Sequence, residues 1–131
     1  MFTTNVFDYT NILDKAADAS WMRENVITNN IANIDTPGYK RQDVDFESVL
    51  QKALGKTKYS SLDKKVRELN QDLGKLTTTS YTDAANYSYR LDRNNVDENT
   101  ENAELVSESL RYQLLTTAIT NNFSRMQTVL K

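Results

Sequence analysis

Residues 97–130, DENTENAELVSESLRYQLLTTAITNNFSRMQTVL, carry the strongest periodic pattern in the chain and decide its fold class. Apolar side chains recur there at steps of three and four residues, the period of an α-helix. The main stripe consists of Tyr112, Leu115, Ile119, Phe123, Met126 and Leu130, and an adjacent stripe consists of Ala103, Val106, Leu110, Leu114 and Thr117. No glycine or proline interrupts the run. We therefore predict one long helix from about Asp97 to Leu130.

A second long helix is predicted at the other end of the chain, from about Asp8 to Asn33. Its apolar residues again follow the helical period, with Ile12, Ala16, Ala19, Val26 and Ile31 near one stripe. Thr36 precedes Pro37 and is therefore biased away from helical geometry. Pro37 and Gly38 suit the two central positions of a type II turn. The helix should end before this turn.

The segment between the long helices is punctuated by two further glycines and divides into short pieces. Two helical turns are expected around residues 46–54, and a short amphipathic helix from Ser61 to Leu73. Residues 77–91 favour extended chain or a hairpin, because Tyr87 and Tyr89 alternate with polar residues.

Helices of this length would reach roughly 40–50 Å at 1.5 Å per residue, and the short middle segment cannot cover them. We therefore predict a mainly α chain in which the two terminal helices pack antiparallel as a coiled-coil-like pair, with outer faces left for other chains. The middle segment would add short helix and some β or extended chain. The expected divisions are residues 1–36, 37–96 and 97–131.

Composition excludes several classes of function. The 131 residues include no cysteine and no histidine, which removes thiol and imidazole nucleophiles and metal ligands. Sixteen basic against 18 acidic residues give a net charge of -2, so no global field favours nucleic acid. The apolar share of 38% is low against the usual ~45–50% and predicts a thin core. No signal peptide and no apolar run of about 18 residues is visible, so we expect a soluble chain without a membrane span.

Asparagines repeat every four residues near the end of the N-terminal helix, at Asn25, Asn29 and Asn33, with Asn30 beside them. Such amides could fix the register of an assembly interface. They could equally form a solvated polar face, and the pattern alone favours neither interpretation.

Charges are unevenly distributed. Residues 52–67 are mostly basic, and residues 92–108 contain six acids against Arg93. These could be complementary patches between subunits, but solvated faces are the favoured interpretation.

Other candidate sites are weak. A base-stacking cluster is only weakly resembled by Tyr87, Tyr89, Arg90 and Arg93, because acidic residues follow at once. Residues 92–97 lack the glycine of a calcium loop, and no pocket gathers around the carboxylates. We predict no catalytic, cofactor-binding or metal site, and no nucleic-acid or small-molecule partner.

Residues 27–40, ITNNIANIDTPGYK, closely resemble the N-terminal signature of the flagellar rod and hook axial protein family. The tail segments 94–97 (NNVD), 103–105, 109–113 and 115–119, together with residues 41–46 (RQDVDF), are similar to the short proximal-rod branch of that family. The resemblance covers residues 8–50 and 92–130. In one departure, Arg93 stands where relatives usually have glycine, so a turn that needs a positive φ would be strained there.

The resemblance implies a non-catalytic structural subunit of the bacterial flagellar basal body, exported by the flagellar type III apparatus and needed for motility. Its terminal helices would assemble in a helical array around a hollow shaft, without a cofactor. The implied partners are other rod proteins, the ring-to-rod adaptor and the export gate. The residues expected to serve assembly are Asn29, Asn30, Asn33, Pro37, Gly38, Tyr39, Leu110, Tyr112, Leu115, Ile119, Phe123 and Leu130.

Three alternatives remain open from the sequence. The chain could be another short proximal-rod protein of the same family. It could be a helical export adaptor or chaperone, which would be an ordered dimer in solution. It could also be a hydrolase of the cell wall, which would need a carboxylate whose mutation abolishes peptidoglycan clearing.

Overall fold

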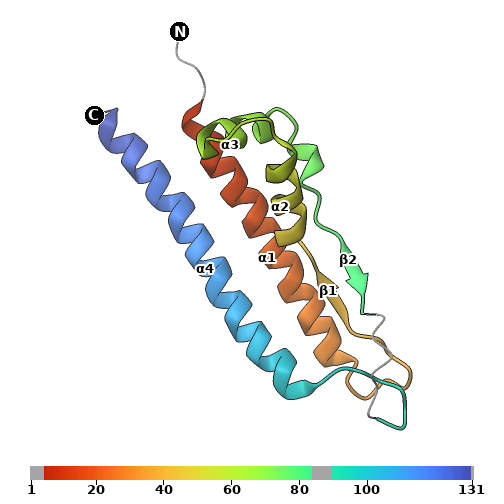
Figure 1. Cartoon of the computed structure of the whole chain (residues 1–131). Helices are drawn as coiled ribbons and strands as arrows, with labels where there is room; N and C mark the ends of the chain where they lie inside the picture. Colours follow the sequence, from red (N-terminus) through yellow and green to blue (C-terminus); the bar gives the residue numbers. More distant parts are fainter. Residues whose placement is uncertain (1–4, 84–89, 131) are drawn as a thin grey trace.

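The structure is a computed structural model, and it describes residues 5–83 and 90–130 (Figure 1). The elements in chain order are a short 3₁₀ turn Asn5–Phe7, α1 Asp8–Ala32, β1 Gln42–Val44, α2 Glu47–Lys56, α3 Leu62–Asn70, a 3₁₀ turn Leu73–Lys75, β2 Ser80–Thr82 and α4 Glu98–Val129. Helices α1 and α4 contain 25 and 32 residues and dominate the molecule.

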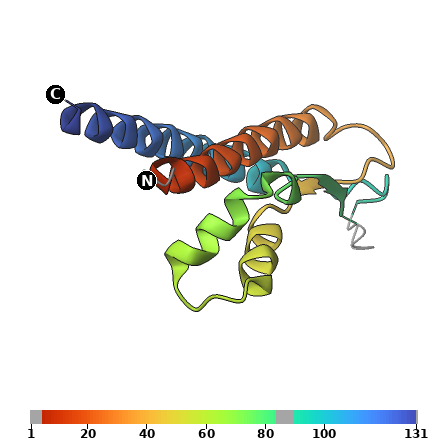
Figure 2. The ribbon, with the colours of Figure 1, turned by 90° about the horizontal axis from the view of Figure 1, so that it is seen from above.

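Helices α1 and α4 lie side by side and antiparallel, which confirms the predicted pair of terminal helices (Figures 1 and 2). Helix α1 begins at Asp8 and ends one residue before the expected Asn33. Helix α4 begins directly after Asp97, its N-cap. The bounds agree with the prediction because neither helix contains a glycine or proline, and Thr36-Pro37 bars continuation beyond α1.

Residues 45–79, which we call the arm, project from one side of α1, away from α4 (Figure 2). The arm packs on the face of α1 that carries Ala19, and Phe46 and Leu76 complete this buried cluster. The partly buried neighbours are Ile12, Ala16, Val49, Leu50, Ala53 and Leu73. The two predicted short helices are present, but α2 continues through Gly55 and α3 ends at Asn70 instead of Leu73.

Strands β1 and β2 close the base of the arm as a two-stranded antiparallel sheet in which Gln42 pairs with Thr82 and Val44 with Ser80. The extended chain expected within residues 77–91 is therefore present as β2. The partner of β2 is β1, which is distant in sequence. Strand β1 lies against α1 and offers an edge to which β2 adds. Tyr87 and Tyr89, on which the hairpin prediction depended, lie outside the described residues.

The core is thin, as the composition predicts. Among the described residues of α4, the only buried side chains are Glu101 and Glu108. Apolar packing between α1 and α4 is partial, and all five residues of the second stripe of α4 are exposed: Ala103, Val106, Leu110, Leu114 and Thr117. Across residues 5–83 and 90–130, no helix has both the length and the apolar content needed to cross a bilayer.

Candidate functional site: the signature joint and the exposed helix faces

The turn after α1 has the geometry that its sequence predicts. Gly38 has φ +73°, which only glycine adopts readily, and the Tyr39 amide donates to the Thr36 carbonyl at 3.2 Å. The Gly38 amide donates to the Asp92 carbonyl at 2.8 Å. The turn is thus hydrogen-bonded to a segment more than fifty residues later, just before α4.

Asn94 holds the end of α1. Its buried side-chain amide donates to the carbonyls of Asn33, Ile34 and Thr36 at 2.9, 2.9 and 3.0 Å. These carbonyls belong to Asn33, the C-cap residue of α1, and to the turn that follows it, so the Asn94 side chain ties the segment before α4 to the turn after α1. Asn95 adds a second connection, since its Oδ1 accepts from the Arg41 amide at 2.7 Å. The NNVD segment and the PGYK turn therefore form one unit, which we call the signature joint.

Arg93 in this joint has φ +62°, so the strain expected from its place in the sequence is present. Its side chain is exposed, and its carbonyl accepts from Lys40 at 2.8 Å. Because a non-glycine residue costs roughly 1 kcal/mol or more in this conformation, Arg93→Gly should raise the free energy of unfolding by about 0.5–1 kcal/mol. Urea denaturation measures the change. Leu91→Gly, at an exposed neighbour with negative φ, should lower stability, and stabilisation by both variants would contradict the strain argument.

Asn30 lies at the centre of the contact between α1, β1 and α4, and it is 0% exposed. Its Nδ2 donates to the Gln42 carbonyl at 2.8 Å and to Glu101 Oε2 at 3.0 Å. Its Oδ1 accepts from the Gln42 amide at 3.0 Å and from the Tyr39 hydroxyl at 3.1 Å. All four hydrogen-bonding sites of this amide are thereby used.

Glu101, also 0% exposed, is the charged partner of Arg41. The Arg41 guanidinium also contacts Asp43 at 3.0 Å and Glu104 at 2.6 Å. Burial alone would lower the pKa of Arg41, but its hydrogen bonds to Glu101 and Asp43 outweigh this effect and raise it. Burial and the Glu101 charge raise the pKa of Tyr39. This group, which we call the lower clamp, ties α4 to the signature.

An upper clamp two turns along α4 is centred on buried Glu108. Its carboxylate accepts from Ser20 Oγ at 2.6 Å and contacts Arg23 at 3.3 Å. Arg23 in turn donates to the Val44 carbonyl at 2.7 Å and pairs with Glu47 at 2.6 Å. The hydrogen bond from Arg23 lowers the pKa of Glu47 to about 2. The α1–α4 contact is therefore fastened by two ion-pair groups where a helix pair would ordinarily bury leucines.

The clamps correct one expectation. The acids of residues 92–108 were interpreted as a solvated face, and this is wrong for Glu101 and Glu108, which face inward to arginines of the same chain. A signal was present in the sequence, because positions 101 and 108 lie seven residues apart, on the face that continues into Tyr112, Leu115 and Ile119. The roles of Arg23, Arg41 and Asn94 were likewise missed.

The asparagine ladder divides between two environments. Asn30 points inward, whereas Asn25 and Asn29 are exposed. The amides of Asn25 and Asn33 donate to the carbonyls four residues earlier, at 2.9 and 2.8 Å. With Asp14, Asp18 and Trp21, the exposed asparagines form an outer face of α1.

The other residues expected to serve assembly occupy three positions. Pro37 and Gly38 are exposed in the signature joint, where Tyr39 is half-buried. Tyr112, Leu115 and Ile119 are half-buried along the inner face of α4. Leu110, Phe123 and Leu130 are exposed by 56%, 50% and 87%. Near the chain ends, the rings of Phe7 and Phe123 pack in a tilted arrangement at a centroid distance of 6.2 Å, beside an apolar groove of about 1060 Å³.

Comparison with known proteins identifies the family to which this chain belongs. Residues 22–40, which contain the signature, match the family model described as flagella basal body rod protein. The chain is 32% identical to the flagellar basal body rod protein FlgB of Bacillus subtilis over 120 residues, 90% of this chain and 89% of the relative. It is 30% identical to FlgB of Borrelia hermsii, covering 97% and 99%, and 33% identical to FlgB of Escherichia coli, covering 83% of each. The chain therefore belongs to the FlgB family of flagellar basal body rod proteins, the structural proximal-rod subunits of the bacterial flagellum.

Proposed function

We propose that α4 and α1 are the assembly elements of this subunit and that the exposed stripe of α4 packs against a neighbouring rod subunit. In this arrangement α1 holds the inner face of α4 while the outer face remains free. Contacts of this kind join different surfaces on successive subunits, so they propagate into an open helical array.

The observation that carries the proposal is the position of the apolar residues on α4. Val106, Leu110 and Leu114 are exposed on the side of the helix opposite the clamps. Full burial of a leucine or valine side chain contributes about 1.5–3 kcal/mol, so this row is a substantial unused source of binding free energy. Contiguous exposed apolar residues of this kind mark interaction surfaces.

Among the residues expected to serve assembly, the exposed ones are available for contacts between subunits. Leu110, Phe123 and Leu130 would contact neighbours directly, and Asn29 would contribute a polar contact that fixes register. Asn30 and Tyr39 would act indirectly, by holding the signature joint in shape. The buried carboxylates of Glu101 and Glu108 are each bonded to an arginine of the same chain, which supports a structural and non-catalytic role.

The proposed partners are other rod proteins along the shaft, with the ring-to-rod adaptor and the export gate at its base. The route to the assembly site would be the flagellar type III apparatus. A helix pair fastened by polar clamps around a thin core suits such a route, because little apolar burial must be undone before the chain is extended.

Leu110→Asp tests the stripe. The charge would be buried at the subunit contact, and a hot-spot loss of 2 kcal/mol or more weakens that contact about 30-fold. We expect a strain that carries only this variant to lose swimming and to lack rods in isolated envelopes. Because Leu110 is exposed, the stability of the isolated subunit should change by no more than about 0.5 kcal/mol.

Asn102→Asp is the matched control, because it places the same charge at an exposed position of α4 beside the stripe. It should support normal swimming. Normal swimming by Leu110→Asp as well would show that the stripe faces no neighbour, and the proposal would then be abandoned.

A further inference from the structure

We propose that Trp21 of one subunit inserts between α2 and α3 in the arm of a second copy of this chain, as a lateral contact in the rod. The inference rests on the proposed assembly function but concerns surfaces other than the α4 stripe. It joins two features that the subunit leaves unexplained: an isolated exposed tryptophan and a pocket with two lysines on its α2 side.

Trp21 is the only tryptophan of the chain, and it is 59% exposed. It lies on the outer face of α1, where its neighbours one and two turns earlier, Asp18 and Asp14, are also exposed. Buried tryptophans supply large apolar areas and are enriched among interface hot spots. A lone indole that follows two carboxylates on the same helix face therefore has the composition of a contact residue with a polar rim.

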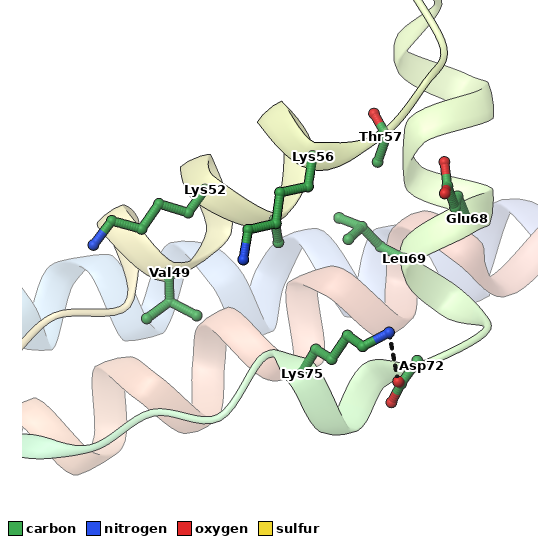
Figure 3. Close-up of a pocket in the computed structure, with 9 residues that line it drawn as sticks. Val49, Lys52, Lys56, Thr57, Glu68, Leu69, Asp72 and Lys75 are labelled. Atoms are coloured by element: carbon green, nitrogen blue, oxygen red, sulfur yellow. Dashed lines mark ion pairs between the residues drawn. The ribbon is translucent and has the colours of Figure 1, made fainter.

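The arm contains a pocket of about 590 Å³ between α2 and α3 (Figure 3). Val49, Ala53 and Leu69 contribute its apolar lining, while Lys52 and Lys56 stand on its α2 side. Its volume lies within the usual range of small-ligand sites, about 300–1,000 Å³, so an indole can enter. Lysine ammonium groups at the rim add a favourable interaction with the aromatic face.

The charges on the two surfaces are complementary and equally spaced. Asp14 and Asp18 are four residues apart on α1, and Lys52 and Lys56 are four residues apart on α2. Four residues advance a helix by about 6 Å, so two carboxylates can meet two ammonium groups together. Among the described residues, none of these four side chains belongs to an ion pair within the subunit, whereas Lys75 at the same pocket already pairs with Asp72 at 2.9 Å.

The net charges of the arm and of the rest of the molecule also favour a second copy of this chain as the partner. The arm, residues 45–79, carries seven basic and five acidic side chains, a net charge of +2. The whole chain has a net charge of -2, which leaves -4 on the rest of the molecule. The basic arm of one copy is therefore attracted to the acidic body of another, and the discrete pairs then fix the register.

A second copy is required because the chain cannot make this contact with itself. The arm covers the face of α1 that carries Ile12, Ala16 and Ala19, whereas Asp14, Asp18 and Trp21 lie on the exposed side. The donor and acceptor surfaces thus differ, and the contact continues from copy to copy without closing on a dimer.

The absence of native cysteine allows a direct test in rods assembled in cells. Full-length Asp18→Cys/Lys56→Cys and Asp18→Cys/Lys52→Cys variants cover both helix directions. After mild oxidation of isolated basal bodies, we expect one of them to form disulfide-linked multimers of this chain. Asp18→Cys/Arg93→Cys, which pairs the donor face with an exposed residue of the signature joint, should remain monomeric.

Two further substitutions, added to the double-cysteine variant that cross-links, test the contributions of the indole and of the charge pairs. Trp21→Ala should reduce the multimer yield severely, since a hot-spot truncation corresponds to about 30-fold weaker association. Asp14→Lys should reduce the multimer yield several-fold. Adding Lys52→Asp to the Lys56→Cys variant, or Lys56→Asp to the Lys52→Cys variant, should restore the yield.

Swimming cells whose rods give no multimers with either pair would overturn the inference, while the contact made by the α4 stripe would be unaffected. Cross-linking of either cysteine to a different rod protein would also overturn it. Failure of the Leu110→Asp test with multimers still present would instead reject the stripe and leave the tryptophan contact standing.

Discussion

Replacing Glu101 with glutamine should lower the free energy of unfolding by about 3 kcal/mol, the lower end of the range for removing one partner of a buried ion pair. The carboxylate is fully buried, and it accepts from both Arg41 and the amide of Asn30. Its loss leaves the half-buried Arg41 guanidinium with only Asp43 and Glu104, and it places a second amide NH₂ against that of Asn30. Urea denaturation at neutral pH measures the difference.

Glu104→Gln is the natural control, because Glu104 pairs with the same arginine at 2.6 Å but has a 44% exposed side chain. An exposed ion pair contributes at most about 1 kcal/mol, so this variant should stay close to the wild type. Equal small losses in both variants would mean that the lower clamp does not hold α4 to the signature.

The second large effect is expected for Asn30→Asp, which changes one atom of the side chain. The Nδ2 group donates to the Gln42 carbonyl and to Glu101, and an oxygen in its place would repel both acceptors. A second carboxylate beside Glu101 would have to be protonated or left partly unpaired in a buried site. We expect a loss of about 3–5 kcal/mol, measured by urea denaturation together with loss of rods in cells.

Asn29→Asp makes the identical change one residue earlier, on the exposed face of α1. It should alter stability by no more than about 0.5 kcal/mol. If both aspartate variants unfold together at lower urea, the cause is charge near the end of α1 and not the bonds of the Asn30 side chain.

The helices were predictable because their information is local. Uninterrupted apolar periods define α1 and α4, and Thr36-Pro37-Gly38 defines the turn between α1 and β1. The register of β1 with β2 was not predictable, since each strand contains three residues and too few side chains to specify a partner.

The clamps were missed for a different reason. Glutamates on a helix are ordinarily solvated, so the position of Glu101 and Glu108 on the inner face of α4 is a weak signal of burial until Arg41 and Arg23 are placed opposite them. Asn94 is a similar case, because its role depends on three carbonyls just after α1 that lie close to it only in the folded chain.

The short sheet at the base of the arm also has a consequence for the length of the arm. Gln42 pairs with Thr82, and the Asp83 amide donates to the Arg41 carbonyl at 2.8 Å, so the chain leaves and re-enters the helix pair at neighbouring points. Closing a longer loop between two fixed points adds only about 0.6 kcal/mol for each doubling of its length. The arm can therefore change in length at little cost in stability while the pair of long helices keeps its geometry.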